Sequence, residues 1–219
     1  TAVWRLPQLE VIWRSQAHDY LINRLQLVGH PTSLWSASSD GTLKRWSWPE
    51  LTERETLSSL SLVGRKESLQ GLWVADTENF AVAGTWSPRL LLFERGPGVP
   101  GWSARDLEIP SPMVYDAVEL PGVGGILLTG AQHPFEVYFF DLESRRISRL
   151  ESFGQPVWWA VRHTSAEPDQ VFVLGLGAIL TYEFRTDKAG FLSYRVWQHV
   201  DTNLGSLLAG VWFEATQQL

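Results

Sequence analysis

The sequence contains no cysteine, a single methionine and no long apolar run. Without cysteine, the chain cannot form disulfides, thiol nucleophiles or cysteine-ligated zinc sites. No apolar run approaches the roughly 18 residues that are needed to cross a bilayer, so we expect no membrane partner. The periodicity of amphipathic helices is also nearly absent. These absences exclude a disulfide scaffold and a thiol enzyme, and they argue against a helical protein.

Charge is sparse and its balance is negative. Charged residues make up 19% of the chain against 44% hydrophobic residues, and the net charge is −6. A disordered chain would carry more charge and fewer aromatics, and the negative sign gives no electrostatic reason to bind nucleic acid. The chain opens on Thr1, without a methionine or a charged-then-apolar leader. We therefore expect a cytoplasmic location and a chain that was trimmed, processed or excised.

The chain is rich in tryptophan, glycine and proline, with 12, 18 and 12 residues respectively. Its apolar residues occur in short runs that are bounded by Gly, Pro, Asp, Asn or Ser, and such runs predict β-strands. They fall in pairs, in which the first runs are 34–38, 80–84, 125–129 and 171–175, and the second runs are 42–46, 89–93, 136–140 and 179–184.

The second runs end in aromatic residues that recur at a nearly constant spacing. These closing residues are Trp4, Trp46, Phe93, Phe140 and Phe184, which are 42, 47, 47 and 44 residues apart. A small residue precedes the last four of them by eight to ten positions: Ser38, Gly84, Gly130 and Gly175. A period near 45 residues with four short strands per repeat is typical of propeller blades. We therefore predict an all-β fold, a β-propeller of four-stranded antiparallel blades with about five blades or a partial larger ring.

The remaining strands of each repeat can also be placed. Inner strands are expected at 21–28, 69–75, 115–120 and 158–163, with one more at 207–214, and polar outer strands at 9–14, 53–57, 102–109, 147–151 and 192–197. Residues 1–219 would then form a single propeller domain with four complete blades and partial blades at both termini. Three arrangements stay open: a five-bladed ring with a three-stranded closing blade, a further strand beyond residue 219, or a piece of a larger ring.

One segment carries a family resemblance. Residues 34–46, with the sequence LWSASSDGTLKRW, resemble the second and third strands of a WD40 repeat, and Ala17-His18 is similar to the Gly-His pair that opens such a repeat. The resemblance implies a structural hydrogen-bond chain through His18, Ser36, Asp40 and Trp46. A buried histidine that donates to aspartate and accepts from serine would leave each polar group with a partner. The other repeats match the family motif only weakly.

The sequence offers no convincing catalytic or metal site. Besides His18, the histidines are His30, His133, His163 and His199, which lie on different repeats without metal-ligand spacing, so we expect no metal and no cofactor. Its glycine pairs lack the further residues of nucleotide-binding loops, and no Gly-x-Ser-x-Gly elbow is present. The carboxylates Asp76, Asp116 and Glu119 belong to the inner strands or their ends but do not recur at one depth. We expect them to be turn residues and solvated strand ends, and the chain not to be an enzyme.

Aromatic and polar residues are predicted to gather at one rim of the blades. Trp86 lies in a turn between second and third strands, where a core role is difficult to arrange. The whole candidate partner-binding rim consists of Asn23, Gln70, Trp86, Tyr115, His133 and Trp158. Large aromatic side chains supply binding energy at a low ordering cost. The alternative interpretation is that these residues cap blade ends against neighbouring loops.

Two functional hypotheses follow. The resemblance implies a non-catalytic protein-protein interaction scaffold whose partner is a protein, a peptide or a further domain of the same protein. The alternative is a carbohydrate-binding or carbohydrate-processing five-bladed propeller, in which tryptophans stack on pyranose rings and converging carboxylates act in hydrolysis.

Overall fold

The structure is a computed structural model that describes most of the chain. The described residues are 2–5, 10–14, 16–29, 32–98, 100–110, 113–130, 132, 135–150, 157–163, 169–175, 178–186 and 192–200. They belong to two compact units, residues 1–83 with 91–107 and residues 84–90 with 108–219. The inner strand predicted at 207–214 lies outside the described residues.

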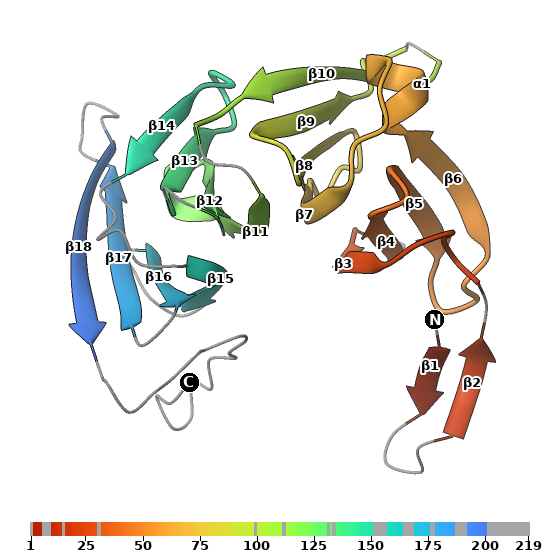
Figure 1. Ribbon diagram of the computed structural model, residues 1–219, viewed down its shortest axis with the longest axis horizontal. Coiled ribbons are helices and arrows are strands. Elements are labelled where there is room, and N and C mark those ends of the chain that lie inside the picture. Colours follow the sequence, from red (N-terminus) through yellow and green to blue (C-terminus); the bar gives the residue numbers. More distant parts are fainter. Residues whose placement is uncertain are drawn as a thin grey trace. The chain divides into compact units, whose positions relative to one another are not determined.

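Short strands joined in sequence order make up the described fold (Figure 1). Blade 1 contains β3 (Ile22–Val28), β4 (Ser33–Ser38), β5 (Thr42–Ser47) and β6 (Glu53–Ser58), and blade 2 contains β7 (Leu69–Val74), β8 (Phe80–Thr85), β9 (Arg89–Glu94) and β10 (Ser103–Glu108). Blade 3 contains β11 (Val114–Leu120), β12 (Gly125–Gly130), β13 (Val137–Asp141) and β14 (Ile147–Leu150), and blade 4 contains β15 (Val157–His163), β16 (Asp169–Gly175), β17 (Ala178–Thr186) and β18 (Leu192–Val200). A two-stranded sheet of β1 (Ala2–Arg5) and β2 (Glu10–Arg14) precedes them. The prediction of an all-β fold with four-stranded blades is confirmed.

The aromatic closing residues Trp46, Phe140 and Phe184 all lie on the third strand of a blade and pair with the start of its second strand. Trp46 of β5 pairs with Leu34, the second residue of β4. Phe140 of β13 pairs with Ile126, the second residue of β12, and Phe184 of β17 pairs with the first residue of β16. Counted from Ser38, Gly130 and Gly175, Phe184 is displaced by two positions from the places of Trp46 and Phe140. Because side chains alternate along a strand, a displacement of two keeps the ring on the same face. The repeat spacing in the sequence therefore reflects a structural repeat.

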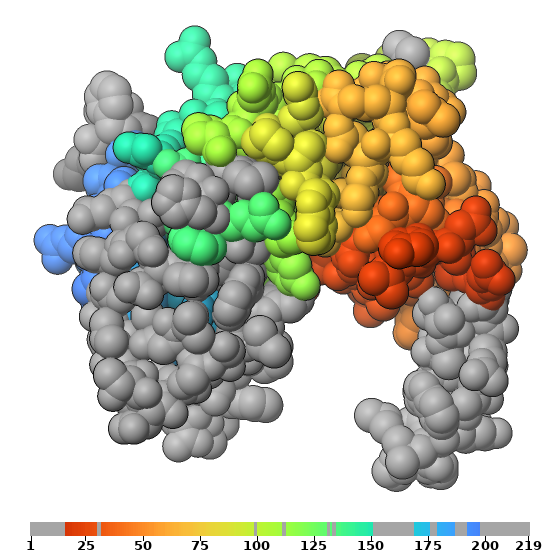
Figure 2. All heavy atoms as spheres, in the orientation of Figure 1, coloured from red at the N-terminus to blue at the C-terminus, as the bar shows by residue number. Residues whose placement is uncertain are grey.

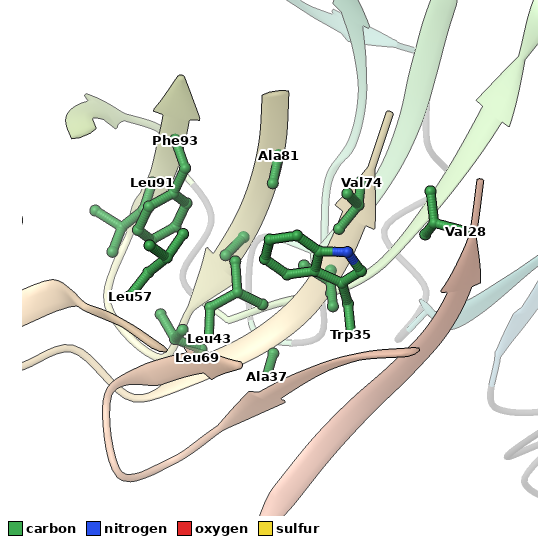
Figure 3. Close-up of a cluster of buried hydrophobic side chains, with 12 residues drawn as sticks. Val28, Trp35, Ala37, Leu43, Leu57, Leu69, Val74, Ala81, Leu91 and Phe93 are labelled. Carbon is green, nitrogen blue, oxygen red and sulfur yellow. The ribbon is translucent and has the colours of Figure 1, made fainter. Parts of the chain in front are cut away.

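Blades 1 and 2 pack face to face within the first unit. Trp35 is fully buried and clusters with Val28 of its own blade and with Val74 and Ala81 of blade 2 (Figure 3). The rest of this cluster comprises Ala37, Leu43, Leu57, Leu69, Leu72, Ala83, Leu91 and Phe93. Each strand contributes alternate residues, so small alanines face large rings and leave space for the Trp35 indole. Burying a side chain of this size stabilises the fold by roughly 2–3 kcal/mol.

A half-buried carboxylate joins the same two blades through polar contacts. Glu78, in the turn between β7 and β8, accepts hydrogen bonds from Trp35 Nε1 at 2.9 Å and Ser33 Oγ at 3.0 Å. It also pairs with Arg45, whose Nε lies 2.5 Å from Glu78 Oε2. Donors on β4 and β5 of blade 1 are thus satisfied by one residue of blade 2. Because a buried donor without a partner is costly, this contact fixes how the blades sit against each other.

The second unit contains a similar cluster between blades 3 and 4. Val137 and Phe139 of β13 pack with residues of β16 and β17, including Phe184, whose ring stacks on that of Phe139 at 6.1 Å between centroids.

Gly84 shows why a small residue recurs at the end of the second strand. A Cβ atom built on Gly84 would lie 2.2 Å from the carbonyl oxygen of Val114. A side chain at position 84 is therefore excluded by the backbone of β11.

Two short helical turns were not anticipated from the sequence. Helix α1 (Ser59–Val63) follows β6, and its C-cap Gly64 adopts a left-handed conformation with φ of 75°. A 3₁₀ turn (Pro121–Val123) follows β11. Leu62 and Val63 of α1 pack against the cluster of blades 1 and 2. A helix of five residues shows too little periodicity to be recognised in a sequence.

Replacing Glu78 with alanine is expected to lower the free energy of unfolding by about 2–3 kcal/mol, because it leaves the buried Trp35 N–H without its acceptor and removes the carboxylate that pairs with Arg45. The Glu78→Gln variant retains one acceptor oxygen and should lose less. Glu50→Ala removes an exposed carboxylate from a turn of blade 1 and serves as the matched control. Urea unfolding of all four proteins gives the comparison. Equal losses for Glu78→Ala and Glu50→Ala would contradict the role given to Glu78.

Candidate functional site

The four residues that the WD40 resemblance singles out lie together in blade 1. His18 precedes β3, Ser36 lies on β4, Asp40 lies in the β4–β5 turn, and Trp46 lies on β5. The turn is tight, since Gly41 has a φ of 85° and the Thr42 backbone N–H donates to Asp40 at 2.9 Å. The hairpin thus brings Asp40 next to a histidine that lies 22 residues earlier in the chain.

The direction of each hydrogen bond follows from Trp46, which can only donate. Its Nε1 lies 2.9 Å from Ser36 Oγ, so the serine oxygen accepts this proton. The Ser36 hydroxyl then donates to His18 Nε2 at 2.7 Å. Nδ1 therefore carries the proton of neutral His18 and donates towards Asp40 Oδ2 at 3.0 Å, with Thr42 Oγ1 at 2.9 Å. Both ring nitrogens are engaged in holding the blade.

Asp40 is the acceptor on which this network converges. Besides His18, it accepts from the Asp19 backbone N–H at 3.0 Å and from the Thr42 hydroxyl at 2.6 Å. Burial alone would raise the pKa of Asp40, but these hydrogen bonds, led by those from Thr42, hold it below the ordinary 3.8. Burial is the largest influence on His18 and holds its pKa below the ordinary 6.5, although the Asp40 charge opposes this shift. A neutral histidine beside a fully bonded aspartate is therefore the resting state of the site.

A polar cavity of about 210 Å³ lies beside this network. Its walls are Gln16, Ala17, His18, Asp19, Asp40, Thr42, Lys44, Thr56 and Lys66. Lys44 is already paired with Glu53 at 2.8 Å, and Thr56 donates to the same carboxylate at 2.7 Å. Positively and negatively charged side chains are mixed along the wall, so the cavity favours neither anionic nor cationic ligands. Among the described residues, no group of three or more His, Asp or Glu side chains is placed to hold a metal ion.

The six predicted rim residues have different surroundings. The Asn23 amide donates to Ser39 Oγ at 2.8 Å and to the Leu69 carbonyl at 2.6 Å, so it links blades 1 and 2. Gln70 is buried and donates to Ser68 at 2.8 Å. Trp86 is 55% exposed and Tyr115 is half-buried. His133 lies outside the described residues; Trp158 belongs to β15, where only the backbone is described.

The candidate carboxylates do not form a described catalytic pair. Asp76 is exposed in the β7–β8 turn. Asp116 and Glu119 lie on the same strand, β11, three positions apart, so their side chains point to opposite faces. Asp116 is buried and accepts from the Ala117 backbone N–H at 2.8 Å.

Sequence reasoning missed two exposed residues next to the His18 network. Tyr20 and Leu21 are 68% and 66% exposed and directly precede β3. Residues 16–29, drawn in red to orange-red, form part of the surface in Figure 2. The inner strand predicted at 21–28 included Leu21, whereas β3 begins at Ile22. An apolar pair just outside a strand has no periodic signal that would reveal its exposure.

The lowered pKa of His18 predicts a loss of stability in mild acid. An unfolded chain takes up a proton at His18 near the ordinary pKa of 6.5, whereas the folded chain does so only at lower pH. The stabilisation is therefore complete above about pH 6.5 and declines as the pH falls from there towards the folded pKa. We expect a smaller free energy of unfolding at about pH 5 than at about pH 7.5. The shift in Asp40 acts below about pH 4 and does not interfere.

Urea unfolding of the wild type and His18→Gln at both pH values tests this expectation. The four other histidines are common to both proteins, so the variant should show a smaller decline. Titration of the His18 imidazole by NMR should give a pKa below that of a free histidine. An identical decline in both proteins, or a raised His18 pKa, would contradict the assignment.

Comparisons with known proteins bear on the fold. No protein-family model matches the chain, and no curated protein matches its sequence. Among solved structures, 881 chains match. One is the crystal structure of RRP9 WD40 repeats, with a TM-score of 0.62 and 12% sequence identity over 81% of this chain and 52% of that chain. This chain thus spans about half the length of that structure. At this identity the similarity concerns the fold alone, and it shows that the chain has a WD40-like β-propeller fold.

Proposed function

We propose that the chain is a non-catalytic interaction platform that binds a protein or peptide partner through the turns at its strand ends. The observation that carries this proposal is Trp86, a large aromatic side chain that is 55% exposed on a rigid turn. A propeller fold alone does not decide function, since the same fold hosts many activities. The support must therefore come from the surface that this particular chain presents.

The turn that carries Trp86 is fixed by a buried hydroxyl. Thr85 is fully buried, and its Oγ1 lies 2.9 Å from the Ser87 carbonyl and 3.0 Å from the Arg89 carbonyl. The Arg89 N–H also donates to the Ser87 carbonyl at 2.7 Å, and the Ile109 N–H donates to the Pro88 carbonyl at 3.0 Å. The backbone on both sides of Trp86 is thus held before any partner arrives. Preorganisation of this kind lowers the entropy cost of binding.

The chemistry of this surface favours a protein or peptide. Tryptophan is among the residues that most often dominate interface energetics, because it buries a large area with few rotatable bonds. In the first unit, considered by itself, Tyr20 and Leu21 are also exposed apolar side chains. The net charge of −6 disfavours a polyanionic partner. No described helix is long and apolar enough to cross a membrane.

We propose as well that residues 1–219 belong to one propeller domain, in which β1 and β2 are the third and fourth strands of a further blade. This assignment is supported by Trp4, which lies on β1 and matches the aromatic closing residues of the other third strands. Asn23 and Gln70 already make side-chain contacts within the first unit.

Replacing Trp86 with alanine is expected to weaken partner capture about tenfold or more, because a central tryptophan anchor typically contributes 2 kcal/mol or more. The melting temperature should change little, since the side chain is largely exposed. Trp158→Ala tests the second predicted aromatic of the rim. Quantitative capture from a cell extract compares these variants with the wild type.

Trp48→Ala is the matched control, because Trp48 is 37% exposed in the β5–β6 turn, at the opposite ends of the strands. Loss of the same captured proteins in Trp48→Ala and Trp86→Ala would mean that the effect is not specific to the rim. Unchanged capture by Trp86→Ala and Trp158→Ala would contradict the proposal. Binding to a glycan array that depends on Trp86 would favour a carbohydrate ligand instead.

A further inference from the structure

The last strand of blade 4 differs from the last strands of the other three blades. Strand β6 has the sequence ERETLS and strand β10 the sequence SARDLE, so each carries three charges in six residues. Strand β14 has only four residues. Short length and dense charge are the usual means by which a sheet edge avoids pairing with another chain. Strand β18 has nine residues, LSYRVWQHV. Arg195 is its one side chain that is charged at neutral pH, apart from any protonation of His199.

Strand β18 is an edge strand with apolar side chains on both faces. It pairs with β17 over nine residues, and no other described strand pairs with its far side. On one face, Tyr194 and Val196 pack against the cluster of blades 3 and 4. Leu192 and Trp197 are 36% and 38% exposed. A long, apolar edge strand presents a row of backbone N–H and C=O groups that can pair with another strand.

We propose that β18 pairs in an antiparallel manner with β18 of a second copy of this chain, in a register centred on Val196. In this register Arg195 of each copy stands directly opposite Trp197 of the other. Arg195 is exposed and makes no ion pair or hydrogen bond with any described residue, so it is available for this contact. A guanidinium over an indole ring is a favourable pair, and the twofold symmetry supplies it twice.

The sequence of the strand favours this occupant and this register. Centring the pair on Arg195 would place two positive charges directly opposite each other, which is unfavourable. Centring it on Val196 avoids that clash and uses the whole length of the strand, with Val196 opposite Val196. An edge that complements itself is what an isologous dimer requires. The inference is independent of the proposed rim function, because Trp86 and β18 belong to different blades.

Two substitutions of opposite charge at position 197 distinguish a role of Trp197 in pairing between copies from a role in the stability of its own blade. Trp197→Glu and Trp197→Lys remove the same indole from the same strand. In the proposed dimer, Glu would face Arg195 of the partner copy and preserve association, whereas Lys would face it with like charge and weaken association about tenfold or more. Sedimentation velocity over the micromolar range gives the monomer–dimer equilibrium of each variant. Ser148→Lys, on the exposed face of β14, controls for an added charge on an outer strand.

We expect the wild type, Trp197→Glu and Ser148→Lys to form dimers and Trp197→Lys to be mainly monomeric. Hydrogen exchange on the wild type adds a readout that needs no variant: amides of β18 should gain protection as the protein concentration rises, while those of β14 should not. A wild type that stays monomeric throughout would overturn the proposal. Equal association of Trp197→Glu and Trp197→Lys, or protection of β18 that does not depend on concentration, would overturn it as well.

Discussion

The burial of blade faces against each other is the constraint on which the described structure depends. A single sheet of four short strands cannot bury enough apolar surface to be stable alone. Trp35 meets this need in the first unit by filling the space between β4 of its own blade and the small residues Ala81 and Ala83 of the next. Phe139 and Phe184 do the same in the second unit. The aromatic-rich, glycine-rich composition follows from this packing, since large rings need small residues opposite them.

Polar networks then determine which arrangement of the packed faces is adopted. Apolar contacts tolerate sliding, but the Trp35 indole N–H finds its acceptor only where Glu78 lies. Within blade 1, His18 and Asp40 play the same part by joining the segment before β3 to the β4–β5 turn. Because an unpaired buried polar group costs more than a paired one gains, such networks act mainly by penalising alternatives. They stiffen the scaffold and are not free to do chemistry.

The order and approximate bounds of the strands could be predicted because the blade repeat leaves a regular trace in the sequence. The inner strand predicted at 69–75 is observed as Leu69–Val74, one residue shorter. The outer strand predicted at 53–57 is observed as Glu53–Ser58, one residue longer. The surroundings of individual polar residues could not be predicted in this way. Glu78 binds donors that lie 33 to 45 residues earlier, and Asn23 reaches a carbonyl 46 residues later, so both depend on how one blade meets the next. Helix α1 was missed because five residues are too few to show a helical period.

Function in such a scaffold must therefore be sought where the sequence departs from what packing requires. Trp86 gains nothing for the core by standing exposed on a turn whose backbone is already fixed by Thr85. Trp197 likewise lies exposed on the edge strand β18. The corresponding edge strands β6 and β10 carry charged residues instead, which protect them from pairing with another chain. An exposed tryptophan on a rigid element keeps its apolar area in water, which is unfavourable for the isolated chain. Cover by a partner would offset this cost, so the two proposals assign binding to Trp86 and Trp197 rather than to the buried His18 network.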